Sequence, residues 1–147
     1  MEVFKICRQV YANLSASGIE NRWNRKGQFV IYTAGSRSLA TLEMVAHRSG
    51  IMPKKPYQTL VIAIDEEEIK QVLISDLTSK WNKLEAYPQL QKVGSDWYEN
   101  NETLILKVPS AIITQEYNYV INTEHPSFAS KVKIVSQEDF YWDERLL

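Results

Sequence analysis

Hydrophobic residues along this chain gather in short runs, and most of these runs have the length and composition of β-strands. Each run is rich in valine, isoleucine, leucine or aromatic residues and is bounded by polar residues, glycine or proline. In the last run, lysines alternate with Val132 and Ile134, which indicates a strand with one buried face. The pattern predicts strands over residues 3–8, 29–32, 57–64, 103–108 and 131–136.

One segment instead has the period of a helix. Ser36 is a suitable N-cap, and the helix is predicted to run to about His47. Glu43 follows Leu39 by four residues, so its carboxylate is expected to border or join the buried face. The apolar stripe predicted for this helix consists of Leu39, Leu42 and Ala46.

The remaining segments are predicted to be connections. Residues 9–27 read as loop, 65–68 as an acidic turn, 75–100 as short helices and loops around two tryptophans, and 117–128 as irregular. Residues 111–113 are expected to continue the preceding strand after a bend at Pro109. Because helices and strands do not alternate regularly, the predicted class is α+β, in a single domain over residues 1–147.

Composition and charge narrow the function classes. The chain has 147 residues, of which 44% are apolar and 24% charged, with a formal net charge of −1. This balance is typical of a globular domain with a core, and it lacks the basic field that nucleic acid or an anionic membrane would require. Cys7 is the single cysteine and the two histidines are far apart, so neither a disulfide nor a metal centre is predicted. No signal-peptide pattern opens the chain, and the expected location is the cytoplasm.

The first candidate for chemistry is the run Arg22-Trp23-Asn24. Taken alone, these residues favour a buried tryptophan that anchors a loop, with Arg22 in water. The alternative is an anion clamp, because a guanidinium group binds phosphate in a bidentate way and stays charged when partly desolvated. Arg8, at a strand end, is either a surface residue or a second clamp.

Tyr32 and Glu43 are the next candidates. The ring of Tyr32 either packs in the core or stacks on a flat aromatic or pyridinium group. Glu43 lies beside leucines, so its carboxylate needs a partner. Two alternatives stay open: a structural salt bridge with an arginine, or a functional role. The functional alternative is a carboxylate that faces the positive charge developing on ribose when an N-glycosidic bond breaks.

Ser110 follows a strand end, but no Gly-x-Ser-x-Gly elbow surrounds it. A hydroxyl that bonds a ligand amide or a catalytic carboxylate is therefore a better interpretation than a nucleophile. Asn118, Asn122 and His125 lie in the predicted irregular segment, where turn chemistry explains them. The chain has neither a Gly-x-Gly-x-x-Gly run nor a Walker loop, so the usual dinucleotide and P-loop folds are not supported.

In this order the motifs resemble the RES-domain family, which is named for arginine, glutamate and serine positions. The resemblance extends over most of the chain. It rests on Ile6-Cys7-Arg8, Arg22-Trp23-Asn24-Arg25-Lys26-Gly27, Val30-Ile31-Tyr32-Thr33-Ala34 with Ser36 to Glu43, Val108-Pro109-Ser110-Ala111, and Glu116-Tyr117-Asn118-Tyr119 with Ile121-Asn122 and His125 to Phe128.

The resemblance implies a compact fold similar to ADP-ribosyltransferases, with central strands and short flanking helices. It implies breakdown of NAD⁺, with phosphate as the acceptor and nicotinamide and ADP-ribose-1″-phosphate as products. It also implies a bacterial toxin whose partner is an Xre-type helix-turn-helix antitoxin. NAD⁺ would be a substrate, so no cofactor is expected, and a homodimer is left open.

Carried over residue by residue, the family's arginines correspond to Arg8 and Arg22, its tyrosine to Tyr32, its glutamate to Glu43 and its serine to Ser110. The hypothesis is that the arginines hold the pyrophosphate or the incoming phosphate, and that Glu43 stabilises the oxocarbenium-like transition state. The substrate-binding residues that complete the predicted site are Trp23, Asn24 and Asn118.

One departure from the family pattern lies just before Arg22. The family usually has a glycine-rich run there, whereas this chain reads Ser15-Ala16-Ser17-Gly18-Ile19 and then Glu20-Asn21. Fewer glycines restrict how closely the backbone can approach a ligand. This departure motivates the alternative of a degenerate domain that binds a partner without catalysis. Two further alternatives concern the acceptor and also stay open: NAD⁺ glycohydrolysis and ADP-ribosylation of a protein.

Overall fold

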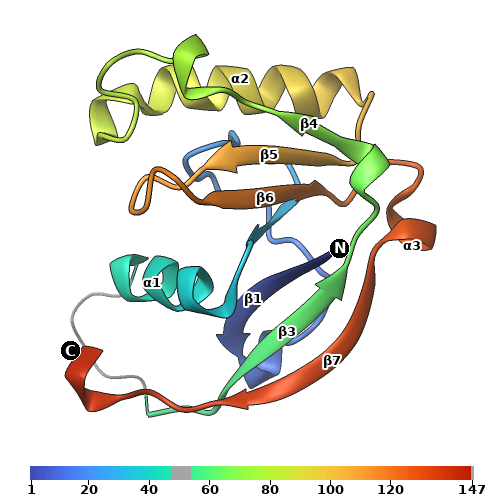
Figure 1. Cartoon of the computed structure of the whole chain (residues 1–147). Coiled ribbons are helices and arrows are strands. Elements are labelled where there is room, and N and C mark those ends of the chain that lie inside the picture. The colour runs from blue at the N-terminus through green and yellow to red at the C-terminus, as the bar shows by residue number, and fades with distance from the viewer. Residues whose placement is uncertain (48–53, 147) are drawn as a thin grey trace.

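The protein was analysed as a computed structural model, which describes residues 1–47 and 54–146. Within these residues, seven strands form one mixed sheet in the order β4-β5-β6-β2-β1-β3-β7 (Figure 1). The strands are β1 (Glu2–Arg8), β2 (Val30–Ala34), β3 (Tyr57–Ala63), β4 (Ile69–Gln71), β5 (Ile105–Pro109), β6 (Tyr117–Asn122) and β7 (Lys133–Phe140). The helices are α1 (Arg37–His47), α2 (Tyr87–Asn100) and α3 (Phe128–Lys131), with 3₁₀ turns at Gln9–Tyr11, Glu66–Glu68, Ile74–Asp76, Leu84–Ala86 and Glu144–Leu146. The predicted α+β class is confirmed.

The sheet divides between β1 and β2. Strand β1 pairs with β3 along its whole length, from Glu2 opposite Ala63 to Arg8 opposite Tyr57. It meets β2 at a single position, Phe4 opposite Ala34. Beyond that pair the two strands separate, and Figure 1 shows β1, β3 and β7 running away from the β5–β6 layer. This separation opens one face of the sheet.

The core has three hydrophobic clusters, and the first and third join the half-sheets on either side of the β1–β2 division. The first fills the space between the two half-sheets and includes Val3, Ile31, Leu60, Ile62 and Ile121. The second lies under α2 and includes Val30, Leu90, Trp97, Leu106 and Val120, and the third lies under α1 and includes Phe4, Ala34, Leu39, Ala40 and Val61. Because alternate residues of a strand share a face, α1 and α2 cover the same side of the sheet.

Helix α1 begins as predicted, since the Leu39 N–H donates to Ser36 Oγ at 3.0 Å. Its predicted apolar stripe is partly wrong. Leu39 is 1% exposed, but Leu42 is 37% exposed and Ala46 is also exposed. Ala40 takes the second buried position, so the helix is rotated about its axis from the predicted face.

The prediction of an irregular segment at residues 117–128 is wrong for its first half, which forms the central strand β6. Asparagines suggested turns there, but the side-chain amides of both donate hydrogen bonds in tertiary contacts. Asn122 is buried and donates to Asn101 Oδ1 at 3.1 Å, while Asn118 donates to a carboxylate described below. Residues 111–113 form a turn rather than a strand extension.

The predicted short helices over residues 75–100 are replaced in their second half by the 14-residue helix α2. Pro88 falls in the first turn, where proline is tolerated because the N–H it lacks would have no helical partner. Gly94 lies mid-helix for a steric reason. A Cβ atom there would stand 1.6 Å from the backbone oxygen of Trp23. The glycine thus lets α2 lie directly against the loop that carries Arg22.

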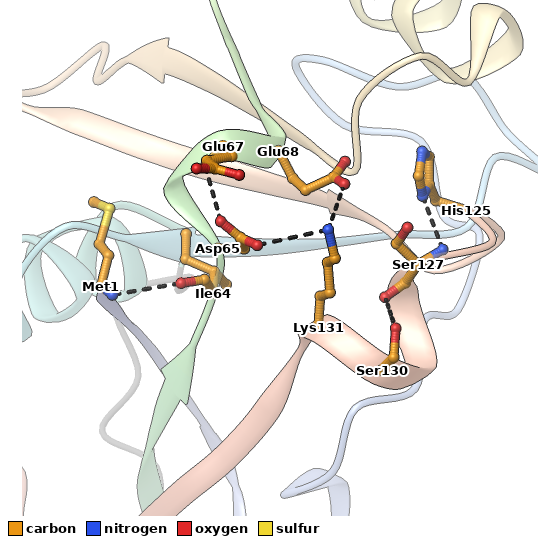
Figure 2. Close-up of polar contacts among 9 residues, drawn as sticks. All are labelled: Met1, Ile64, Asp65, Glu67, Glu68, His125, Ser127, Ser130 and Lys131. Carbon is orange, nitrogen blue, oxygen red and sulfur yellow. Dashed lines mark hydrogen bonds and ion pairs between the residues drawn. The ribbon is translucent and has the colours of Figure 1, made fainter.

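A charged corner joins β3 to the β4 edge of the sheet (Figure 2). Lys131 Nζ lies 2.9 Å from Glu68 Oε1 and 3.6 Å from Asp65 Oδ2. The Lys131 hydrogen bond holds the pKa of Glu68 below its usual range. The N-terminal amine donates to the Ile64 carbonyl at the same corner. The acidic turn predicted at residues 65–68 is therefore part of a tertiary contact.

Among the residues that the structure describes, no helix combines the length and apolar character needed to cross a bilayer.

The first prediction concerns Gly94. Alanine favours helices over glycine by about 1 kcal/mol, so an exposed substitution of this kind would stabilise α2. At Gly94 we expect the reverse, a loss of about 1–3 kcal/mol in the free energy of unfolding, because the methyl group meets the Trp23 backbone. Urea denaturation of Gly94→Ala beside Glu99→Ala, an exposed position on the same helix, measures this. Equal stability of Gly94→Ala and the unsubstituted protein would contradict the contact.

Candidate active site

A cleft of about 380 Å³ opens where β1 leaves β2. Its walls are β1, β2, the inner side of α1 and the loop at residues 21–23, and Tyr57 on β3 also lines it. The volume is within the range of pockets that hold small molecules and cofactors. Of the predicted site residues, the cleft lining contains Arg8, Arg22, Trp23, Tyr32, Glu43 and Asn118.

The loop that carries Arg22 is fixed from inside by Asn24. The Asn24 side chain is buried, and its Nδ2 lies 3.0–3.2 Å from the carbonyl oxygens of Ile19, Arg25 and Gln28. Its Oδ1 accepts a hydrogen bond of 2.6 Å from the Tyr32 hydroxyl. Asn24 therefore bonds protein groups, and it is absent from the cleft lining.

Tyr32 joins this loop to strand β2. Its hydroxyl donates to Asn24 and accepts the backbone N–H of Trp23 at 3.0 Å. Trp23 is itself 2% exposed and packs in the cluster under α2. Burial raises the pKa of Tyr32 well above its ordinary value, so the phenol stays protonated. The aromatic ring borders the cleft while its hydroxyl serves as a structural bridge.

Each of the two arginines stacks on a tyrosine. The Arg22 guanidinium carbon lies 4.8 Å from the centroid of the Tyr87 ring, and that of Arg8 lies 5.4 Å from the Tyr11 ring. Arg22 Nη1 and Arg8 Nε are both buried without a hydrogen-bond partner in the described part of the chain. Buried donors are normally satisfied. Two unsatisfied guanidinium donors in one cleft indicate a site for an anionic ligand.

Glu43 points toward the ends of β5 and β6. Its Oε1 accepts hydrogen bonds from Ser110 Oγ at 2.9 Å and from Asn118 Nδ2 at 2.7 Å. The arginine salt bridge that the sequence left open does not occur among the described residues, where Oε2 has no hydrogen-bond partner. Asn118 Oδ1 is also buried without a partner in that part of the chain. Within the described residues, one carboxylate oxygen of Glu43 is anchored and the other has no protein partner.

The Ser110 hydroxyl has a defined direction. Its oxygen accepts the backbone N–H groups of Ile112 and Ile113, both at 3.1 Å. The two N–H groups occupy the lone pairs, so the single hydroxyl proton is free to be donated to Glu43. The geometry agrees with the interpretation of Ser110 as a donor to a carboxylate.

The charges around the cleft favour an anion. Lys5, Arg8 and Arg22 line it together with one carboxylate, Glu43. Burial lowers the pKa of Lys5. Basic groups that gather in a concave, partly desolvated surface raise the local concentration of anionic ligands. No group of three or more potential metal-ligating side chains is present among residues 1–47 and 54–146.

Sequence reasoning missed Tyr87 and Tyr57. Tyr87 supports Arg22 from the first turn of α2, and no spacing in the sequence relates residues so far apart. Tyr57 is the first residue of β3 and was interpreted as a strand residue alone. Its exposure to the cleft follows from its pairing with Arg8, which the sequence does not reveal.

The chain is similar in sequence to a known protein family and to several of its members. The family model of the RES domain matches residues 2–143. "Toxin Res" of Yersinia enterocolitica is 32% identical over 125 residues, which cover 85% of this chain and 82% of the relative. "Toxin Res" of Photorhabdus laumondii is 31% identical over 152 residues, covering 100% and 97%. The "Prs ADP-ribosylating toxin" of a Sphingobium strain is 32% identical over 142 residues, covering 92% and 87%.

A solved structure shares the fold. The crystal structure of the M. tuberculosis MbcT–MbcA toxin–antitoxin complex contains a chain that superposes with a TM-score of 0.78 at 15% identity. The match covers 95% of this chain and 83% of the other. At this identity the likeness concerns the fold.

The second prediction concerns Tyr32. Tyr32→Phe removes the acceptor of the Trp23 N–H, and we expect a loss of about 1–3 kcal/mol in the free energy of unfolding near neutral pH. Because the folded state raises the pKa of Tyr32, the unfolded state releases this proton first as pH rises through about 10. The contribution of Tyr32 is therefore complete below that pH and falls above it.

Urea denaturation at pH of about 8 and about 11 tests both parts. The stability gap between the unsubstituted protein and Tyr32→Phe is expected to shrink at the higher pH. Tyr141→Phe, at a side chain that is 82% exposed, is the matched control and is expected to show no gap. A gap that stays constant with pH would show that Tyr32 ionises normally.

Proposed function

The chain belongs to the RES domain family, and on that premise we propose that it is a toxin that cleaves the bond between nicotinamide and ribose in NAD⁺. The proposed acceptor is inorganic phosphate. The observation that carries the proposal is the carboxylate of Glu43, held at one oxygen, in a cleft where one donor on each of two arginines has no partner among the described residues.

Glu43 supplies the negative charge that this reaction needs. Breaking the N-glycosidic bond leaves positive charge on the nicotinamide ribose, as in glycoside hydrolysis. Ser110 and Asn118 hold Oε1, so the carboxylate is oriented before the substrate binds. A preorganised charge of this kind lowers the barrier because it does not have to reorient in the transition state.

The arginines supply the anion site. Arg22 Nη1 and Arg8 Nε are buried donors without partners in the described chain, and a pyrophosphate presents oxygens to both. The ring of Tyr32 also lines the cleft, with its hydroxyl bonded to the Trp23 N–H beside Arg22, and it offers a flat surface for nicotinamide or its ribose. Trp23 completes the wall beside Arg22.

The chemical step balances without a strong acid. The C1″–N bond breaks, and its electron pair returns to the pyridinium ring, so nicotinamide leaves as a neutral molecule. A phosphate oxygen forms the new bond to C1″, which gives ADP-ribose-1″-phosphate. No catalytic histidine is needed. The residues of the cleft contribute by orienting the substrate and by stabilising the charge that develops on the ribose.

Protein ADP-ribosylation is the second candidate, because one relative carries the name ADP-ribosylating toxin. Water in place of phosphate would make the protein a glycohydrolase. All three reactions break the same bond through Glu43 and differ only in the acceptor.

The proposed biological setting is a toxin–antitoxin pair in the cytoplasm, where NAD⁺ is accessible. Two of the relatives reported above are named "Toxin Res", and one solved structure with this fold is a toxin–antitoxin complex. The antitoxin partner that we propose is an Xre-type helix-turn-helix protein that covers the cleft.

The third prediction concerns Glu43. Glu43→Gln keeps the shape and removes the charge, and we expect NAD⁺ consumption to fall by about 100-fold or more. The assay follows NAD⁺ with and without phosphate and resolves the products by mass. Phosphate-dependent formation of ADP-ribose phosphate by the unsubstituted protein supports the phosphorylase, and free ADP-ribose supports the glycohydrolase.

Glu85→Gln, at an exposed carboxylate outside the cleft, is the matched control. Near-normal turnover in a folded Glu43→Gln variant would overturn the role of Glu43. Absence of turnover in the folded unsubstituted protein would favour the degenerate binding domain. The glycine-poor loop before Arg22 would then be the first feature to test as the cause of the lost activity.

The fourth prediction concerns Arg22. A hydrogen bond to a charged group contributes about 1.5–3 kcal/mol, so Arg22→Ala is expected to raise the KM for NAD⁺ by about 10- to 100-fold. Lys26→Ala removes an exposed positive charge from the same loop and is expected to change little. Steady-state kinetics of both variants decide the assignment. An unchanged KM in Arg22→Ala would exclude this residue as the clamp.

A further inference from the structure

One row of side chains crosses the sheet at the far end of the cleft. Arg8 on β1 lies directly opposite Tyr57 on β3, and Tyr57 lies directly opposite Phe140 on β7. Residues directly opposite one another in antiparallel strands point to the same face, with their Cβ atoms about 4.5–5.5 Å apart. The phenol ring of Tyr57 therefore stands beside the arginine whose Nε is unsatisfied.

The ring of Tyr57 is held in place on one side and borders the cleft on another. Trp142 contacts it with ring centroids 5.6 Å apart and an interplanar angle of 83°. Trp142 in turn contacts Phe140 with centroids 5.4 Å apart at 89°. Both contacts are edge-to-face, so Trp142 fixes the orientation of Tyr57 without stacking parallel to it. Tyr57 remains part of the cleft lining.

The position of Tyr57 relative to Glu43 follows from the register of the sheet. Asn118, which donates to Glu43, lies opposite Ala34, and Ala34 lies opposite Phe4. Arg8 is four residues further along β1 than Phe4, a rise of about 13 Å at the usual strand spacing. The carboxylate and Tyr57 therefore occupy different ends of the cleft, with Arg8 beside Tyr57.

We propose that Tyr57 is the adenine-binding residue of this cleft and stacks on the purine of the dinucleotide while Arg8 holds the adjoining phosphate. The inference deepens the proposed function and rests on it, since the substrate must be a dinucleotide with its nicotinamide end at Glu43. Aromatic rings bind bases through their faces, and a ring already fixed by its neighbours loses little entropy on binding.

Two substrates and a binding measurement test the assignment. Nicotinamide mononucleotide carries the bond that breaks but has no adenine, whereas NAD⁺ carries both. Tyr57→Leu is expected to raise the KM for NAD⁺ by about tenfold or more, because base stacking on an aromatic ring contributes about one to two powers of ten in affinity. The kcat/KM for nicotinamide mononucleotide is expected to stay unchanged. Tyr57→Phe retains the ring and is expected to behave like the unsubstituted protein.

Calorimetry with ADP, which has the adenine and the pyrophosphate, gives a readout independent of turnover. The unsubstituted protein and Tyr57→Phe are expected to bind ADP, and Tyr57→Leu to bind it about tenfold or more weakly. Tyr141→Leu, next to Trp142 but 82% exposed, is the matched control and is expected to bind ADP normally. Thermal melting shows whether each variant is folded.

The outcomes separate this inference from the proposed function. Equal losses with NAD⁺ and nicotinamide mononucleotide, or unchanged ADP binding by folded Tyr57→Leu, would overturn the adenine assignment and leave NAD⁺ cleavage standing. No turnover of either substrate by the unsubstituted protein would overturn the proposed function, and ADP binding would then decide the role of Tyr57 alone.

Discussion

The buried amide of Asn24 is the constraint on which the candidate site depends. Its nitrogen donates hydrogen bonds to carbonyl oxygens on both sides of a loop, and its oxygen accepts a hydrogen bond from the Tyr32 hydroxyl. Since the Trp23 N–H also donates to that hydroxyl, the loop and strand β2 are fixed to each other at two points. Arg22 precedes Trp23 directly, so these contacts place its backbone, while its guanidinium group stacks on Tyr87. In the motif Arg-Trp-Asn, Arg22 and Trp23 therefore line the cleft, and Asn24 holds them in position from inside the loop.

The single pairing between β1 and β2 has an equally direct effect. Full pairing would continue the sheet and leave no space between Arg8 and the Arg22 loop. Contact at Phe4 and Ala34 alone keeps the strands joined at one end and separate at the other. Helix α1 then covers the joined end and brings Glu43 to it, while α2 supports the loop from outside through Gly94. A bent sheet thus provides both the rigid frame and the opening.

The sequence was informative where local pattern and local structure coincide. The strands at β1 and β3, the Ser36 cap and the class of the fold were predicted, because alternation and capping are short-range properties. Strand β6 was not, since Asn118 and Asn122 have turn chemistry in isolation and acquire their partners only through tertiary contacts. Helix α2 was not predicted as one continuous helix, since Gly94 interrupts the helical pattern. This glycine is needed because the backbone of Trp23, 71 positions earlier in the chain, leaves no space for a Cβ atom.

The candidate site was likewise predictable from local sequence in its residues but not in its contacts. Arg8, Arg22, Tyr32, Glu43 and Ser110 were chosen as residues of unusual chemistry that resemble a family pattern. The structure places the first four in the lining of one cleft, and Ser110 is buried and bonded to Glu43. The sequence could not predict which atoms of these side chains contact one another. That Ser110 and Asn118 meet on the same oxygen of Glu43, and that Tyr87 lies under Arg22, depends on register and helix placement.

The environment of Ser110 has a consequence for covalent chemistry. A serine becomes a nucleophile when a base removes its proton and a lone pair is free to attack. Here two backbone N–H groups occupy the oxygen, and the proton is directed to a carboxylate that would need to accept it fully. Fluorophosphonate and β-lactone reagents, which label the activated serines of hydrolases, have no free electron pair to react with at this position. The protein would thus be invisible to serine-directed activity probes, although the buried Ser110 bonds the carboxylate that lines its cleft.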